Sequence, residues 1–177
     1  MRIAKISTTF SDYPCPDDCA ILVTLVGCNF NCPGCQNKEL QDPNYPGAKV
    51  FSSDNIVEMI RSMDTKTQKY SKIVFVGGEP LYKSNVSSMR VLVPKLKELG
   101  YDICIYTGHN LKQAEYELAY AFGDVKYIKT GLYDESLAQV SGKTDTEMTF
   151  GSSNQELYKI DSGKIILKSL NGIVKFD

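Results

Sequence analysis

Apolar residues along this chain occur in short runs that alternate with amphipathic stretches, and a loop containing glycine or cysteine follows each run. Runs of this length are typical of buried strands, whereas the longer stretches carry apolar residues at helical spacing. The pattern predicts strands over 20–26, 72–76, 102–106 and 125–129, and helices over 54–63, 86–99 and 111–122. Strands that alternate with helices of about ten or more residues indicate βα units and a parallel sheet, and therefore an α/β fold.

The C-terminal part of the chain has a different pattern. Two apolar segments, 164–168 and 173–176, flank Asn171-Gly172, a dipeptide that favours two-residue hairpin turns. We therefore expect one domain over residues 1–177 that ends in a short antiparallel hairpin. Ligands of α/β folds bind at the carboxyl ends of the parallel strands, so the loops after the four predicted strands are expected to form the functional site.

Composition narrows the classes of protein that the chain could represent. Hydrophobic residues make up 42% and charged residues 23%, as in ordinary globular proteins. A net charge of -1 argues against a broad surface for nucleic acid or an anionic membrane. The apolar run 20–26 is too short to span a bilayer, and the first residues lack the apolar segment of a signal peptide. A cytoplasmic location, where thiols stay reduced, is therefore expected.

Five of the six cysteines lie between positions 15 and 35. Cys28, Cys32 and Cys35 form a C-x3-C-x2-C pattern directly after the first predicted strand. Three thiolates on one loop can bind one metal centre, and sulfur ligands select zinc, copper(I) or an iron–sulfur cluster. A structural zinc site is normally closed by four ligands, whereas three ligands leave a position open for a substrate or cofactor.

The other cysteines leave alternatives open. Cys15 and Cys19 form a second C-x3-C pair, which could join two of the later cysteines in a closed zinc site. They could instead pack as small apolar side chains, or serve an auxiliary metal or redox role. Cys104 lies within the apolar run 103–106 and is expected in the core.

Two motifs in the expected order resemble those of the radical S-adenosylmethionine superfamily: the three-cysteine loop, and Gly77-Gly78-Glu79-Pro80, which matches its GGEP motif. Within that superfamily the chain is similar to the activating enzymes of anaerobic (class III) ribonucleotide reductase. That similarity covers about residues 10–160 and includes Tyr106-Thr107-Gly108, Lys129-Thr130-Gly131-Leu132-Tyr133 and Gly151-Ser152-Ser153-Asn154-Gln155.

The resemblance implies a partial βα (TIM-like) barrel that binds a [4Fe–4S] cluster and S-adenosylmethionine at its carboxyl face. In such enzymes the reduced cluster cleaves S-adenosylmethionine to a 5′-deoxyadenosyl radical, which abstracts a hydrogen from one glycine of the large reductase subunit. A flavodoxin-type protein is the expected electron donor. The cofactors supply this chemistry, and the protein supplies binding and orientation.

The resemblance also implies roles for individual residues. Cys28, Cys32 and Cys35 would ligate the cluster. The GGEP motif, from Gly77 to Pro80 and including Gly78 and Glu79, would bring backbone close to the methionine amino group, because glycine permits close approach.

Contacts to the rest of S-adenosylmethionine are implied less directly. Thr107 would hydrogen-bond the ribose or carboxylate, and Lys129 would pair with the carboxylate; a solvent-facing or capping role is the alternative for both. The superfamily often has an aromatic residue where this chain has Gly34, and the activating enzymes follow the third cysteine with Tyr or Phe where this chain has Gln36. Phe30 is therefore the expected substitute for packing on the adenine.

Two other functions compete with the activating enzyme. One is a radical enzyme for a small molecule, such as the 7-carboxy-7-deazaguanine synthases, which are similarly small. The other is a non-enzymatic zinc or electron-transfer module, which requires a closed four-thiol site.

Overall fold

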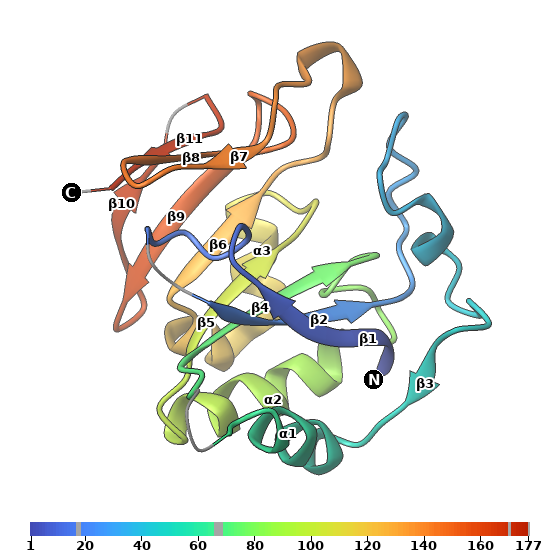
Figure 1. Ribbon diagram of the computed structural model, residues 1–177. Helices are drawn as coiled ribbons and strands as arrows, with labels where there is room; N and C mark the ends of the chain where they lie inside the picture. Colours follow the sequence, from blue (N-terminus) through green and yellow to red (C-terminus); the bar gives the residue numbers. More distant parts are fainter. Residues whose placement is uncertain (17–18, 66–68, 170, 177) are drawn as a thin grey trace.

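An eight-stranded mixed sheet organises the computed structural model, which describes residues 1–16, 19–65, 69–169 and 171–176 (Figure 1). The strands are β1 (Arg2–Thr9), β2 (Ala20–Leu25), β3 (Lys49–Val50), β4 (Lys72–Gly77), β5 (Asp102–Tyr106), β6 (Tyr127–Thr130), β9 (Glu156–Asp161) and β10 (Lys164–Lys168). Their order is β10-β9-β6-β5-β4-β2-β1-β3. The central strands β2, β4, β5 and β6 run parallel, and β1 and β9 flank them in the antiparallel sense.

One face of this sheet is covered by helices, and most of the residues on that face are apolar. The helices are α1 (Ser53–Ser62), α2 (Val86–Glu98) and α3 (Leu111–Leu118), with 3-10 turns η1 (Lys38–Gln41), η2 (Ala119–Asp124) and η3 (Glu135–Leu137). Alternate strand residues such as Val23, Phe75 and Ile105 pack in one core cluster with Ile60 of α1 and Leu92 of α2. Burial of this apolar surface is the main stabilising contribution to the fold.

The α/β prediction and the four parallel strands are confirmed, although the third helix ends earlier than expected, at Leu118, and continues as η2 from Ala119. The barrel is not confirmed. The sheet is open, because β10 and β3 stand at its two ends and no pairing joins them within the described residues.

Strand β1 is missing from the sequence prediction for a physical reason. Alternation of apolar and polar residues identifies a half-buried strand, but the register of β1 against β2 shifts between Ile3 and Lys5. Such an irregularity breaks the two-residue period. The segment therefore shows no strict alternation, although Ile3 is buried.

The predicted C-terminal hairpin is wrong. Asn171 and Gly172 both have positive φ, as a tight turn requires, but the flanking strands go to different sheets. Strand β10 pairs with β9 across a turn at Ser162-Gly163, and the buried Ser169 fixes the end of β10 by two hydrogen bonds to the backbone of Leu157. The turn at Ser162-Gly163 therefore pairs β10 with β9, and β10 does not pair with β11.

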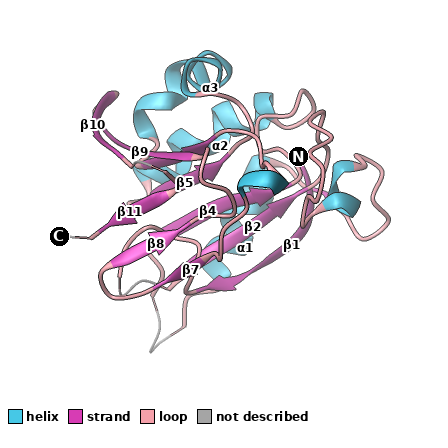
Figure 2. Ribbon diagram, turned by 90° about the horizontal axis from the view of Figure 1, so that it is seen from above, coloured by secondary structure: helices cyan, strands magenta, loops and turns pink. Residues whose placement is uncertain are grey.

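The last strand instead completes a small sheet of β7 (Gly142–Lys143), β8 (Glu147–Thr149) and β11 (Ile173–Lys175), in the order β11-β8-β7. Met148 and Phe150 belong to a cluster that packs against Tyr106 and Tyr127 on the large sheet. Figures 1 and 2 show this small sheet on the side of the strands away from α3. No helix in the described part of the chain is long and apolar enough to cross a membrane.

Candidate cluster and cofactor site

The loops after the four parallel strands meet at the carboxyl edge of the sheet. Backbone hydrogen bonds join them: Gly78 N donates to Leu25 O (2.9 Å) and Glu79 N donates to Gly27 O (2.8 Å). The loops after β5 and β6 are joined in the same way, because Gly131 N donates to His109 O (3.0 Å). The sequence motifs that were predicted to act together are therefore neighbours in the structure.

The cysteine loop leaves β2 at Gly27 and carries three half-buried thiols, Cys28, Cys32 and Cys35. Phe30 N donates to Cys28 Sγ at 3.3 Å. Burial raises the pKa of the Cys28 thiol to about 11 and raises that of Cys32, while a hydrogen bond from the backbone N–H of Tyr133 acts in the opposite direction on Cys32. Thiols in such surroundings become thiolates when a metal displaces the proton.

The closed zinc site that would combine both groups of cysteines is contradicted. Cys19 precedes β2 and Cys28 follows it, so six strand residues separate them by about 20 Å. Cys15 packs near Tyr13 and Ala20, away from the cysteine loop. Among the described residues no three His, Cys, Asp or Glu side chains are grouped closely enough for a single metal ion, and this includes the three thiols of the cysteine loop. The packing role is confirmed for Cys15, and also for Cys104, which is fully buried.

The glycines of the GGEP motif pack against the chain itself. A Cβ at Gly77 would lie 2.3 Å from Leu25 O, and one at Gly78 would lie 2.6 Å from Gly27 O. Gly77 also has a φ of +115°, which glycine adopts without strain. Both glycines therefore allow the β4 exit to lie directly against the start of the cysteine loop.

Glu79 is buried and connects the loop after β4 to the loop after β5. Its carboxylate accepts hydrogen bonds from Leu81 N, Thr107 Oγ1 and Gly108 N, each at 2.8 Å. Burial raises the pKa of Glu79, and these three donors act against that rise. Glu79 and Thr107 thus bind each other, and neither they nor the buried Pro80 lie among the residues that line the cavity described below.

Phe30 reaches across to the exit of β5. Its ring lies over Gly108, where an added Cβ would meet it at 2.6 Å, and it makes an edge contact with His109 (4.8 Å between ring centroids). Nδ1 of His109 is buried without a hydrogen-bond partner within the described residues. Gly34 (φ +68°) faces a different neighbour, because a Cβ there would lie 2.7 Å from the carboxyl carbon of Glu135.

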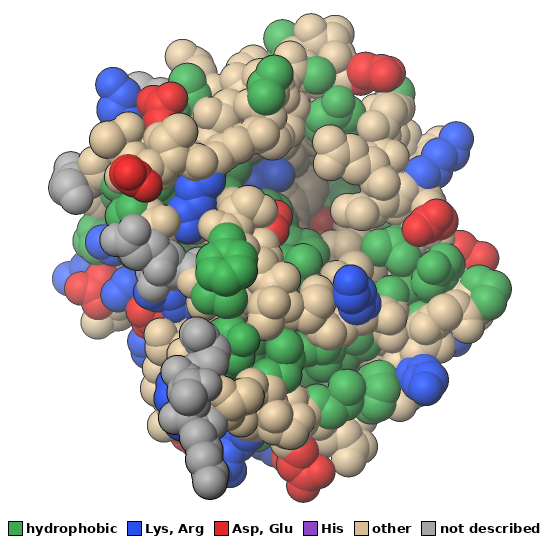
Figure 3. Space-filling model, in the orientation of Figure 1, with side chains coloured by type: hydrophobic (Ala, Val, Ile, Leu, Met, Phe, Trp, Pro, Cys, Tyr) green, Lys and Arg blue, Asp and Glu red, His purple; other side chains and the backbone are tan. Residues whose placement is uncertain are grey.

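A cavity of about 450 Å³ lies beside the cysteine loop, on the sheet face opposite the helices. Figure 3 shows the corresponding hollow, with basic atoms at its floor. The large sheet, the N-terminal segment, the cysteine loop and the small sheet all line it: Ser11, Asp12, Leu22, Thr24, Cys35, Gln36, Asn37, Val76, Tyr106, Lys129, Tyr133, Ser141, Gly142, Met148, Thr149, Phe150, Gly151 and Gln155. Its volume falls within the ~300–1,000 Å³ of sites for drug-sized ligands.

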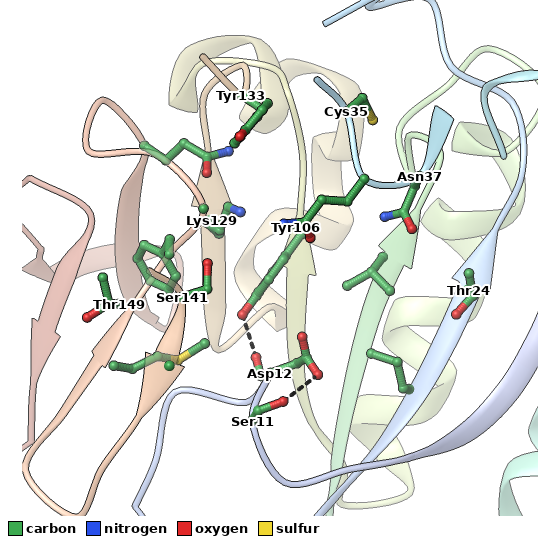
Figure 4. Close-up of a pocket in the computed structure, with 18 residues that line it drawn as sticks. Ser11, Asp12, Thr24, Cys35, Asn37, Tyr106, Lys129, Tyr133, Ser141 and Thr149 are labelled. Carbon is green, nitrogen blue, oxygen red and sulfur yellow. Dashed lines mark hydrogen bonds between the residues drawn. The ribbon is translucent and has the colours of Figure 1, made fainter. Parts of the chain in front are cut away.

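Lys129 is the cation of this cavity, as Figure 4 shows. Its ammonium group lies 4.6 Å from the ring centroid of Tyr106 and 5.5 Å from that of Phe150. Burial lowers the pKa of Lys129 to about 8, while Cys104 and Asp12 act to raise it. Tyr106 in turn donates from its hydroxyl to Asp12 O (2.6 Å), which holds the N-terminal segment at the rim.

Sequence reasoning missed most of the cavity wall. Leu22, Thr24, Val76 and Tyr106 follow from strand alternation, since they occupy the positions that do not face the helices. Asp12 and the residues of the small sheet carry no comparable signal. They come from irregular segments that reach the cavity only through tertiary packing.

Comparison with known proteins agrees with this arrangement. The family model described as a 4Fe-4S single cluster domain matches residues 18–158, so the chain belongs to that family. The anaerobic ribonucleoside-triphosphate reductase-activating protein of Escherichia coli (strain K12) is 26% identical over 144 residues, 80% of this chain and 88% of that protein. Its namesake in Salmonella typhi is 25% identical over the same length.

A third relative has a similar name. A Methanocaldococcus jannaschii protein that carries the name glycyl-radical enzyme activating enzyme is 31% identical over 117 residues, 66% of this chain and 41% of that protein. The chain therefore resembles the glycyl-radical activases.

The residues present fit an iron–sulfur cluster, whose thiolate ligands bind different iron atoms and need not converge on one ion. The three thiols lie on one loop, Cys28 accepts a backbone N–H donor, and Cys35 opens onto the cavity. Backbone donors to sulfur are typical of iron–sulfur sites. The cavity gives a second ligand direct access to the third cysteine.

Proposed function

We propose that this protein is a radical S-adenosylmethionine enzyme that activates an anaerobic ribonucleotide reductase by installing a glycyl radical on its large subunit. One observation carries the proposal: the three-cysteine loop borders a cavity of suitable size that also contains a lysine. The activating-protein relatives and the cluster family support it.

Cys28, Cys32 and Cys35 would hold a [4Fe–4S] cluster, which together with S-adenosylmethionine supplies a 5′-deoxyadenosyl radical. Lys129 would pair with the carboxylate of S-adenosylmethionine, because it is the cation that lines the cavity. The neutral rings of Tyr106 and Phe150 lie beside its ammonium group, and no ion pair within the described residues compensates its charge.

Other proposed contacts depend on the loops around the cysteines. Gly77 and Gly78 keep the end of β4 close to the cysteine loop. Glu79 and Thr107 fix the ends of β4 and β5 relative to each other. Phe30 and Gly34 remain the proposed adenine neighbours on the loop itself. The chain thus provides a preformed binding site, and radical chemistry requires such a site to keep out water and side reactants.

The surface around the cavity favours a protein substrate over a small molecule. Phe10, Leu132 and Val140 are exposed, at 72%, 45% and 90% of their surface, and each adjoins a residue that lines the cavity. Hydrophobic side chains also lie at the rim of the hollow in Figure 3. Grouped exposed apolar residues mark interaction sites, so this rim would receive the large reductase subunit. A flavodoxin-type protein would supply the electron.

The test is anaerobic reconstitution with iron and sulfide, followed by electron paramagnetic resonance (EPR) with and without S-adenosylmethionine. We expect a signal from the reduced cluster that changes when the cofactor is added, and a glycyl radical after incubation with the large reductase subunit. Cys32→Ala should lose the iron, whereas the matched variant Cys19→Ala should keep it, because Cys19 lies at the opposite edge of the sheet.

Two results would redirect the proposal. A wild-type protein that binds zinc in place of iron would overturn the radical chemistry. Cleavage of S-adenosylmethionine without any protein radical would favour the small-molecule enzymes, of which the 7-carboxy-7-deazaguanine synthases are an example.

A further inference from the structure

The segment Gly151–Gln155 connects β8 to β9, and its polar side chains bind one particular loop. Gln155 Nε2 donates to Gly131 O at 2.9 Å, and Asn154 Nδ2 donates to Leu132 O at 2.9 Å. Ser152 Oγ accepts from Asp134 N at 3.2 Å. Three side chains of the segment thus hold three backbone groups of the loop that follows β6.

Gln155 is the most constrained member of this segment. Its side chain is 5% exposed, and its Oε1 accepts a hydrogen bond from Ser152 N at 3.3 Å while its Nε2 binds the loop. The amide is therefore fixed at both ends. Gly131 has a φ of +102°, and a Cβ there would lie 3.5 Å from the Cα of Gln155, so the two backbones lie in close contact.

The loop held in this way lies against the cysteine loop at two points. The backbone N–H of Tyr133 lies close enough to the thiol of Cys32 to lower its pKa, against the rise that burial causes. Independently, Glu135 approaches Gly34 closely enough that an added Cβ would meet its carboxyl carbon at 2.7 Å. Tyr133, Gln155 and Cys35 also line the same cavity, and Figure 4 shows Tyr133 and Cys35 together at its upper end.

We infer that Gln155, with Asn154 and Ser152, is a positioning residue that holds the loop after β6 so that the N–H of Tyr133 donates to the sulfur of Cys32. This role rests on the proposed function, since it concerns Cys32 as a cluster ligand. Hydrogen bonds to ligand sulfur stabilise the more negative, reduced state and raise the reduction potential. The Gly-Ser-Ser-Asn-Gln segment therefore sets a property of the cluster without touching it.

The experiment compares the midpoint potentials of reconstituted wild type, Gln155→Ala and Gln139→Ala by redox titration with EPR detection. Gln139 is a matched control, because its amide also donates to backbone carbonyls, but to those of Asn171 and Gly172 and not to those of Gly131 and Leu132. We expect Gln155→Ala to disfavour reduction about tenfold, a shift of ~59 mV for one electron, and Gln139→Ala to match wild type.

A second variant and a second signal keep the test decisive if Gln155→Ala does not take up a cluster. Asn154 is exposed and holds the adjacent carbonyl, so Asn154→Ala should fold and show a smaller shift in the same direction. Electron–nuclear double resonance should detect an exchangeable proton coupled to the wild-type cluster that weakens in both variants.

The outcomes separate this role from the proposed function. Potentials equal to that of wild type in Gln155→Ala, or in Asn154→Ala where only that variant carries a cluster, would overturn the positioning role alone. A wild-type protein that takes up no iron would overturn the proposed function, and the positioning role with it.

Discussion

The two faces of the central strands differ in composition, although both are formed by residues that alternate along the same strands. On the helix side, Val23, Phe75 and Ile105 have no exposed surface and belong to the apolar core cluster. On the cavity side, Thr24, Tyr106 and Lys129 are interspersed with aliphatic residues. Neighbours in the chain thus serve different ends: one face stabilises the fold and the other forms the site.

The difference follows from what covers each face. Helices α1, α2 and α3 fill the space above one side, so a polar group there would lose water without gaining a partner. The small sheet and the N-terminal segment only border the other side, which leaves a cavity that accommodates a lysine. Substitutions on the two faces should therefore change different measured quantities.

The largest effect on stability is expected from Phe75→Ala on the helix face. Removing a fully buried ring leaves a cavity in the core, and we expect the free energy of unfolding to fall by about 3–5 kcal/mol. Urea denaturation followed by circular dichroism measures it. Val76→Ala, one position along on the cavity face, should cost about 1 kcal/mol or less; equal costs would contradict the contrast between the faces.

Lys129→Met, on the cavity face, should change ligand affinity and leave stability nearly unchanged. Losing the cation from the cavity should weaken S-adenosylmethionine binding by about 1.5–3 kcal/mol, roughly 10–150-fold, with little change in the unfolding free energy. Isothermal titration calorimetry on the reconstituted protein measures the affinity. Lys126→Met provides the comparison, because Lys126 is not one of the residues that line the cavity. Unchanged affinity in Lys129→Met would remove the lysine from the proposed site.

The same lysine predicts a pH dependence. Because burial lowers the pKa of Lys129 to about 8, its charge is present below that value and is lost as the pH rises through it. Affinity for a carboxylate ligand should therefore be constant below about pH 7 and fall above pH 8, by up to tenfold (about 1.4 kcal/mol) per unit. Binding measured from pH 6.5 to 9.5 should show this decline in wild type, and a flat profile in Lys129→Met.

The smallest effect is expected from Tyr106→Phe, which removes the hydroxyl bound to Asp12 O. One such hydrogen bond contributes about 0.5–1.5 kcal/mol, and here it fixes the N-terminal segment at the cavity rim. Hydrogen exchange should show faster exchange around residues 10–16 in this variant. Tyr116→Phe, on a ring that is 78% exposed, should leave exchange there unaltered. Equal exchange rates in the two variants would show that the hydrogen bond from Tyr106 to Asp12 O does not hold the N-terminal segment.

The cysteine loop and the strand exits could be predicted from the sequence because their signals are local. The spacing of Cys28, Cys32 and Cys35 lies within one loop, and the parallel strands are marked by apolar runs that end in glycine. The C-terminal hairpin was mispredicted because two turn signals, at Ser162-Gly163 and Asn171-Gly172, compete for the same strand. Local preference gives no means of deciding between them.

What the sequence determined by itself is the alternation of strands and helices, the loop that bears the thiols, and the order in which the motifs follow the strands. Three further features follow from tertiary packing: Glu79 and Thr107 bind each other, Cys19 lies far from Cys28, and Asp12 and the small sheet border the cavity with Lys129. Periodicity and spacing act over a few residues, whereas these contacts join segments far apart in the chain, and the packing of the whole molecule selects them.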